Sequence, residues 1–411
     1  MATVKVYSYT SRDTAGKLVK GKIDAPNEPS VVARLRTMGL APVTISESSA
    51  GTGLSREITI PGIGNKAVGL KDLAIMARQM ATMIAAGLSL LKTLSILAEQ
   101  TPNKRLATTL GDVRSEIESG QSLSESLAKY PLIFPRLMIH LVRAGEAGGF
   151  LDSALESIAK NFESDVKLRG TIKSALTYPI AVLIMAFAAV ILMLIFIVPV
   201  FQAMFDSLGG TLPLPTQILV VLSQNMIWIV PLLTVIIVAV SIWWRNNKHT
   251  DEVRRVVDPI ILKAPVFGPL FQKVAIARFA RNFGAMIGAG VPILQSLGIV
   301  GETSGNWVIE QALQKVQESV RIGNSISGPL SKESVFPPMV VQMMAVGEDS
   351  GSMETMLEKI ADFYDEEVTA TADALTSLIE PLMIAVIGTV IGGMIVSLYM
   401  PIFSIFNEIN K

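Results

Sequence analysis

The most prominent polar motif in this sequence is a glutamate flanked by glycines, and it occurs twice. Its residues are Gly145, Glu146 and Gly149 in the first occurrence and Gly347, Glu348 and Gly351 in the second. The glycines could free the backbone at the end of a helix, while the glutamate could pair with a basic side chain or cap the next helix. The carboxylate could instead face a partner protein or an ion. The motif alone leaves both interpretations open.

Residues suited to enzymatic chemistry are otherwise scarce. The chain has no cysteine and only two histidines, His140 and His249, which leaves almost nothing for thiolate or histidine chemistry. The sequence contains no P-loop, no Gly-x-Ser-x-Gly elbow and no His-Glu-x-x-His. Its 35 basic and 35 acidic residues cancel, so no net positive field attracts nucleic acid directly. We expect no catalytic residue, cofactor or metal, and a protein that is not an enzyme.

The composition indicates a membrane protein. Of the 411 residues, 50% are hydrophobic and 17% are charged, and the mean hydropathy is +0.49. Three stretches without a charged residue exceed the roughly 20 residues that cross a bilayer. They predict transmembrane helices at 174–205, 218–244 and 381–406. A proton-coupled transporter usually places ionisable groups at this depth, and these stretches have none.

An internal duplication organises the chain. Residues 78–91 return 203 positions later as 281–294, and the Gly-Glu motif returns 202 positions later. Each copy is a polar segment of helical periodicity that ends in a membrane span. We therefore expect a mainly α, integral membrane protein with two duplicated helical bundles of about six helices each, at 70–173 and 245–380.

One helix start differs between the copies. Ser122 with Glu125 fits a capping box that begins a helix. The second copy has Gly328 and Pro329 near the corresponding place. We therefore expect that helix start to be made differently.

Charge and duplication together predict the orientation. Basic residues lie on the bundle side of the first two spans: Lys167, Arg169, Lys173, Arg245 and Lys248. The loop between these spans, 206–217, has no lysine or arginine. The positive-inside rule then places the N-terminus and both bundles in the cytoplasm and the loop outside. Since the second span returns the chain between two like copies, the third should run parallel to the first and leave the tail 407–411 outside.

The N-terminal region differs in character from both copies. Residues 1–47 predict a small α/β module, and 48–69 have the glycine- and serine-rich composition of a flexible linker. Within the module we expect strands at 4–9, 18–23 and 42–45, a turn at 13–17 and a helix at 28–38.

Two further patterns lie on the spans. The entries and exits of the first and third spans carry Tyr178, Pro179, Pro199, Pro381 and Pro401. A proline at the start of a span is tolerated or bends the helix. Gly388 and Gly392 form a Gly-x3-Gly pattern on the third span, which permits close helix packing within the chain or across a dimer.

These features together resemble the type II secretion F / type IV pilus PilC family. The resemblance rests on the duplicated Gly-Glu-x-x-Gly units, the Ser-Ala-Leu-Thr-Tyr-Pro entry that ends at Pro179 and the Ile-Val-Pro-Val-Phe exit around Pro199. The three spans, the repeat and the N-terminal module are similar as well, so the resemblance covers nearly the whole chain.

The resemblance implies a multi-pass platform protein of the bacterial inner membrane without enzymatic activity. Such a platform couples a hexameric cytoplasmic assembly ATPase to the insertion of pilin or pseudopilin subunits into a filament. Other inner-membrane alignment proteins and a homodimer or higher oligomer are implied as well. The alternative from a different class is an oligomeric membrane transporter or channel. The sequence does not distinguish pilus, type II secretion and DNA-uptake machines.

Overall fold

The computed structural model describes residues 5–12, 18–25, 28–39, 41–48, 67–207, 212–248 and 250–409. The chain divides into two compact units, Met1–Asn65 and Lys66–Lys411, which we describe separately. The predicted turn at 13–17 and most of the predicted linker at 48–69 lie outside the described residues.

The N-terminal unit is a three-stranded antiparallel sheet with one helix. Its elements are β1 (Lys5–Arg12), β2 (Leu18–Ala25), α1 (Glu28–Thr37) and β3 (Ala41–Ser48), with strand order β2-β1-β3. Tyr7 on the central strand packs with Val31 and Leu35 of α1 in a small apolar core. The predicted α/β module is confirmed.

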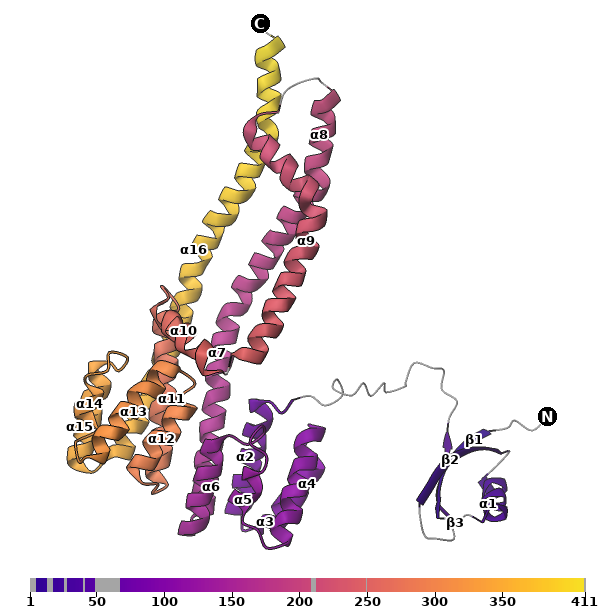
Figure 1. Cartoon of the computed structure of the whole chain (residues 1–411), viewed down its shortest axis with the longest axis vertical. Helices are drawn as coiled ribbons and strands as arrows, with labels where there is room; N and C mark the ends of the chain where they lie inside the picture. Colours follow the sequence, from indigo (N-terminus) through magenta and orange to yellow (C-terminus); the bar gives the residue numbers. More distant parts are fainter. Residues whose placement is uncertain are drawn as a thin grey trace. The chain divides into compact units, whose positions relative to one another are not determined.

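The first copy is a bundle of short helices that ends in a long one (Figure 1). Its elements are α2 (Leu70–Ala85), α3 (Leu90–Gln100), α4 (Lys104–Glu118), α5 (Leu123–Ala128), α6 (Arg136–Gly148) and α7 (Leu151–Leu192). Side-chain caps start three of them, because Ser89, Asn103 and Ser122 each accept backbone N–H groups from the first turn. The expected count of about six helices is confirmed for this copy.

The second copy repeats this order. Its elements are α11 (Gly268–Gly288), α12 (Ile293–Thr303), α13 (Trp307–Arg321), α14 (Ser327–Leu330), α15 (Pro338–Ser350) and α16 (Met353–Ile409). A further helix, α10 (Asp251–Lys263), precedes them. The described residues before α2 hold no counterpart of α10.

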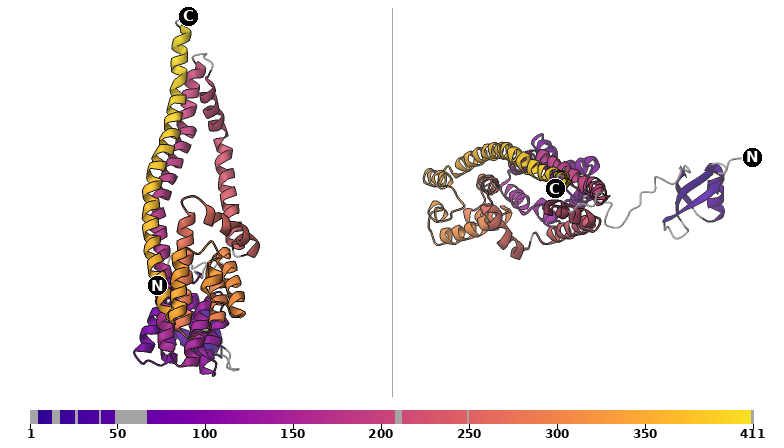
Figure 2. Two further views of the ribbon diagram at one scale, coloured as in Figure 1. Left: turned by 90° about the vertical axis from the view of Figure 1, so that its left-hand side faces the viewer. Right: turned by 90° about the horizontal axis from the view of Figure 1, so that it is seen from above.

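Within the described part of the chain, three helices are long and apolar enough to cross a membrane. The first is α7, which continues through a π-helical turn (Met193–Ile197) into α8 (Val198–Ser207). The others are α9 (Leu214–Asn247) and α16. Figure 2 shows α7 and α16 rising from the bundles toward the same end, and α9, which lies between the two copies in the sequence, running back toward the bundles. The predicted count of three spans is confirmed.

Several expected boundaries fall inside continuous helices. The divisions at 173/174 and 380/381 interrupt neither α7 nor α16, and α16 remains helical through Ile409, within the expected tail. The expected span 218–244 extends to 214–247, which shortens the loop before it. The expected boundaries were placed where charged residues end in the sequence. A helix does not end there, because its backbone groups can remain hydrogen bonded through charged and uncharged segments alike.

The two copies share one apolar core. Buried residues of both copies, such as Leu110, Leu155 and Phe162 from the first and Phe279 and Leu357 from the second, belong to a single cluster. Separate bundles were expected from the duplication. Their joint packing places α7 beside α11 and α16, which brings polar residues of both copies together.

Candidate functional site

Glu146 holds the start of a neighbouring helix. Its Oε1 accepts the N–H of Leu123 at 2.6 Å and its Oε2 accepts the N–H of Ser124 at 3.0 Å. Ser122 Oγ accepts the next N–H, that of Glu125, at 3.2 Å. The first N–H groups of α5 would otherwise lack partners, and the carboxylate also faces the positive end of the helix dipole. The capped helix is α5, which precedes the motif, whereas the capping considered among the alternatives was that of the following helix.

Glu348 does the same in the second copy. Its oxygens accept the N–H groups of Ile326 at 2.7 Å and Ser327 at 3.2 Å, and Ser327 Oγ donates to it at 3.0 Å. Ser325 Oγ accepts the N–H of Gly328 at 3.2 Å. The carboxylate and serine contacts of α5 thus recur, although α14 begins only at Ser327 and its N-cap residue Ile326 has no side-chain cap, so the two helix starts differ in part as expected.

The motif glycines serve two geometric purposes. A Cβ at Gly145 would lie 2.7 Å from the Ala154 Cβ, and one at Gly347 would lie 3.1 Å from the Met353 Cα. These glycines therefore allow the helix after the motif to pack closely on the helix before it. Gly149 and Gly351 have φ of 75° and 69°, a left-handed conformation that glycine adopts without strain at a helix end.

A repeated arginine joins the first and last helix of each bundle, and sequence reasoning gave it no role. Arg78 of α2 forms a bidentate pair with Glu163 of α7, both contacts 2.7 Å long, and contacts Glu156 at 2.5 Å. The equivalent Arg281 of α11 contacts Asp365 of α16 at 2.5 Å. The signal was present in the repeat, because an arginine and an acidic residue recur together in both copies.

The charges of these pairs respond to their surroundings. Hydrogen bonds to Glu163 and Glu156 raise the pKa of Arg78, and the same hydrogen bonds lower the pKa of both glutamates. Burial raises the pKa of Asp365, although Arg281 acts in the opposite direction. The first pair is thus held as ions near neutral pH, while burial makes ionisation of the acid in the second more costly.

Polar contacts also join the two copies. Asn161 Nδ2 donates to Asn282 Oδ1 at 2.6 Å, and both residues are buried. Arg278 Nε contacts Asp165 Oδ1 at 2.7 Å, and Arg136 pairs with Glu302. A cleft of about 490 Å³ lies beside these contacts and is lined by residues of α7, α11 and α16. Among the described residues, no group of His, Asp or Glu is arranged to hold a metal ion.

Two prolines in the first long helix leave backbone carbonyl oxygens without their helical N–H donors. Side-chain hydroxyls of other helices lie within hydrogen-bond distance of these oxygens. Pro179 has no N–H for the carbonyl of Ala175, and the hydroxyl of Thr376 in α16 lies 3.3 Å from that oxygen and 3.0 Å from the carbonyl of Ala372 in its own helix, so the two oxygens share one proton. In the π-helical turn the N–H of Val198 bonds to Met193 and Pro199 has none, so the Leu194 carbonyl lacks an intrahelical donor. Ser223 of α9 donates to it at 2.5 Å.

The exit of the third span repeats the arrangement at Pro199. Pro401 cannot donate to the carbonyl of Ser397, and Thr216 of α9 donates to that oxygen at 2.5 Å. Thr216 and Ser223 are seven residues apart and therefore lie on one face of α9. Helix α9, which has no counterpart in the repeat, thus donates hydrogen bonds to a carbonyl near the exit proline of each repeated span.

The remaining span residues lie at the surface of the chain. Tyr178 and Pro381 are exposed. Outside its own helix, a Cβ at Gly388 or Gly392 would meet no atom of the described residues within 4 Å. These glycines therefore do not pack closely on another described helix of the same chain.

Comparison with known proteins identifies the repeated unit. The family model described as type II secretion system (T2SS), protein F, matches residues 76–199 and 279–401, so each match ends at or beside one of the span prolines. The chain belongs to the type II secretion system protein F family. The N-terminal domain model of the same family matches residues 1–46, which include the small α/β module.

Full-length relatives carry two kinds of name. The type IV pilus assembly protein PilC of Myxococcus xanthus is 40% identical over 407 residues, covering 98% of this chain and 96% of the relative. PilC of Thermus thermophilus is 40% identical over 406 residues, with 98% and 99% covered. The type II secretion system protein F of Vibrio cholerae is 30% identical over 408 residues, with 98% and 99% covered.

Replacing Glu146 with glutamine should destabilise the first bundle. Glutamine offers one uncharged acceptor oxygen in place of two charged ones, so one N–H of α5 loses its partner, at a cost of about 1–3 kcal/mol. We expect full-length Glu146→Gln and Glu348→Gln variants to reach the membrane but to become protease-sensitive at lower temperature in detergent.

Glu125→Gln is the matched control. Glu125 lies on α5 itself and is exposed, so removing its charge leaves the cap intact. Equal melting temperatures of the control and the two cap variants would contradict the importance of the cap.

Removing the α9 hydroxyls should loosen the spans. Thr216→Val and Ser223→Ala each leave a carbonyl inside the membrane without a donor, and interhelical hydrogen bonds of this kind contribute on average about 0.6 kcal/mol and at most about 1.7. Thermal unfolding in lipid bicelles should show lower midpoints for each variant and the lowest for the pair. Thr234→Val is the control, since its hydroxyl bonds to the carbonyl of Val230 in its own helix. A control that falls as far as the other two would count against this role.

Proposed function

We propose that this chain is a non-enzymatic inner-membrane platform on which a type IV pilus or a type II secretion pseudopilus is assembled. The observation that carries the proposal is similarity over 98% of the chain to proteins named for pilus assembly and type II secretion. The architecture supports it, because two joined bundles at one end of three apolar spans form a scaffold between an aqueous compartment and a membrane.

In the proposed orientation the N-terminus and the bundles are cytoplasmic and the C-terminus lies outside. Both long helices leave the bundles in the same direction, as expected for two copies facing one compartment (Figure 1). Basic residues such as Lys173 and Arg245 lie at the bundle end of the spans, whereas 206–217 has none.

The proposed partners follow from this orientation. A hexameric assembly ATPase would contact the bundles, and pilin or pseudopilin helices would contact the lipid-facing surfaces of the spans, beside other alignment proteins. Because α7 and α16 run without interruption from bundle to span, a force applied to a bundle would reach the membrane through hydrogen-bonded helix. No nucleic acid takes part directly in this scheme.

A membrane transporter or channel is the alternative from another class. The cavity of about 480 Å³ at span level is lined by α9 alone, from Leu214 to Ile229, and is thus a surface groove. Residues 174–205, 218–244 and 381–406, which form the three spans, contain no Asp, Glu, Lys, Arg or His. These observations favour the platform.

Capture from native membranes should recover the machine. We expect the tagged full-length chain, solubilised in mild detergent, to retain a hexameric ATPase and pilin-like subunits identified by mass spectrometry. A tagged membrane protein of unrelated fold, expressed at the same level, serves as the control. If the chain comes down alone, and purified chain in liposomes passes a solute that empty liposomes retain, the transporter is the better description.

The third span should meet a second copy. Since Gly388 and Gly392 have open surface above them, a homodimer contacting there would bring the two α16 helices close. The chain has no cysteine, so Gly388→Cys in membranes should give an oxidised dimer of twice the mass. Val240→Cys, exposed on α9, is the control and should remain monomeric. Equal cross-linking at both positions, or none at Gly388→Cys, would contradict this interface.

A further inference from the structure

Helix α10 lies across the direction of the spans at the point where the second bundle begins. It starts at Asp251, only a few residues after α9 ends at Asn247. It meets α11 at an angle of 115°. Because α11 runs alongside α16, which continues into the membrane, α10 is turned roughly parallel to the membrane plane. Figure 1 places it at the bundle end of the spans.

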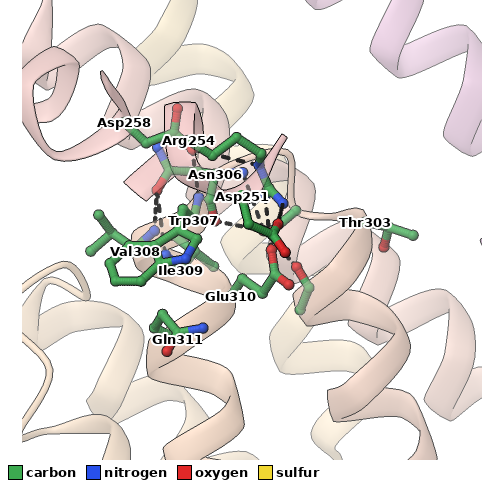
Figure 3. Close-up of polar contacts among 12 residues, drawn as sticks. Asp251, Arg254, Asp258, Thr303, Asn306, Trp307, Val308, Ile309, Glu310 and Gln311 are labelled. Atoms are coloured by element: carbon green, nitrogen blue, oxygen red, sulfur yellow. Dashed lines mark hydrogen bonds and ion pairs between the residues drawn. The ribbon is translucent and has the colours of Figure 1, made fainter. Parts of the chain in front are cut away.

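One face of α10 is tied to the bundle below it. Arg254 Nη2 contacts Glu310 Oε2 at 2.8 Å, and Asp258 Oδ2 accepts the N–H of Trp307 at 2.7 Å (Figure 3). Asp258 thereby caps the start of α13, where the helix dipole favours a negative charge. These contacts leave α10 little freedom to rotate about its axis, and they determine which side chains point away from the bundle.

The opposite face of α10 carries an uncovered apolar pair that lies between the exposed charges of Glu252 and Lys263. Val256 and Ile260 are 59% and 63% exposed, and their spacing of four residues places them side by side. None of the described residues of α10 is buried. At the corner with α11, Val266 is 47% exposed with a φ of 75°, a backbone conformation that is costly for a β-branched residue. Placing these side chains among acyl chains would remove their apolar surface from water.

The neighbouring α11 cannot be the segment that enters the lipid. By length and composition α10 and α11 together could form a broken span. Yet α11 carries Lys273, Arg278 and Arg281, each paired with an acidic residue of α7 or α16. Its apolar residues, such as Phe279 and Phe283, lie in the shared core. The apolar surface left for lipid is therefore that of α10.

We propose that α10 is an interfacial helix that lies in the bundle-side leaflet, with Val256 and Ile260 among the acyl chains and Lys263 at anionic lipid phosphates. Lys263 stands in its last turn and Arg245 in the last turn of α9, so both cations reach the headgroup level. Pro259 leaves the carbonyl of Arg255 without its helical donor, which suits a helix at the hydrated interface and not one in the hydrocarbon. This surface would set the depth of the second bundle, independently of the proposed function.

The test uses the full chain, which has no cysteine of its own. Single Val256→Cys and Ile260→Cys variants carry an environment-sensitive nitrobenzoxadiazole label in liposomes of phosphatidylcholine and phosphatidylglycerol, with or without nitroxide-labelled lipids. The control is Ile322→Cys, also a strongly exposed apolar residue, at the far end of α13 about 22 Å from α10. We expect blue-shifted emission at 256 and 260 and nitroxide quenching about threefold stronger than at 322.

Two results would overturn the proposal. Water-like emission without quenching at 256 and 260 would mean that α10 remains in solution. Blue-shifted emission that nitroxide lipids fail to quench would mean that protein, such as a second copy, covers this face.

The lipid charge is tested on the same label. Lys263→Glu added to the Ile260→Cys variant should weaken quenching in vesicles containing phosphatidylglycerol and leave it unchanged in pure phosphatidylcholine. An equal change in both vesicle types, or none in either, would contradict a contact between Lys263 and anionic phosphates. Neither arm requires a pilus or secretion partner, so failure here is distinct from failure of the platform role.

Discussion

The membrane part of this protein is arranged around backbone carbonyls that proline leaves without a donor. Each such oxygen would be costly in hydrocarbon, where no water replaces the missing N–H. The hydroxyls of Ser223 and Thr216 donate to the oxygens freed by Pro199 and Pro401, and the hydroxyl of Thr376 is shared between the oxygen freed by Pro179 and the Ala372 carbonyl. Each of these hydroxyls lies on a helix other than the one that contains the proline. These hydrogen bonds therefore also help to determine which helices are neighbours.

This constraint explains why the duplication is incomplete. A chain with two like bundles on one side of a membrane needs a returning span, and topology alone would accept any apolar helix. Here the returning helix α9 also carries the two hydroxyls that serve the exit prolines of both repeated spans. Helix α9, which is not part of the repeat, therefore contacts both repeated spans. After α9, helix α10 leads the chain into the second bundle.

The sequence was sufficient for the fold class because its signals are local and repeated. Uncharged stretches predict spans, periodicity predicts helices, and the duplication predicts two bundles, all of which the structure confirms. The shared core was not predictable, since the contact of Asn161 with Asn282 depends on how two finished bundles meet. The same holds for Glu146, whose partners Leu123 and Ser124 lie more than twenty residues away. The repeat therefore identified Glu146 as a candidate residue but did not predict its hydrogen-bond partners.

The shared core limits how the bundles can move. Sliding one copy past the other would separate the buried Asn161–Asn282 pair and leave amide groups without partners, which costs more than the net energy of the hydrogen bond itself. The pair of Arg278 with Asp165 would be lost as well. Within each copy, Arg78 and Arg281 bind the first helix to the long one. Tilting of both bundles together preserves all of these contacts, because α7 and α16 extend from the same core. Such a tilt would change the angle of both helices relative to the membrane. In the proposed platform, the two bundles would accordingly move as one body.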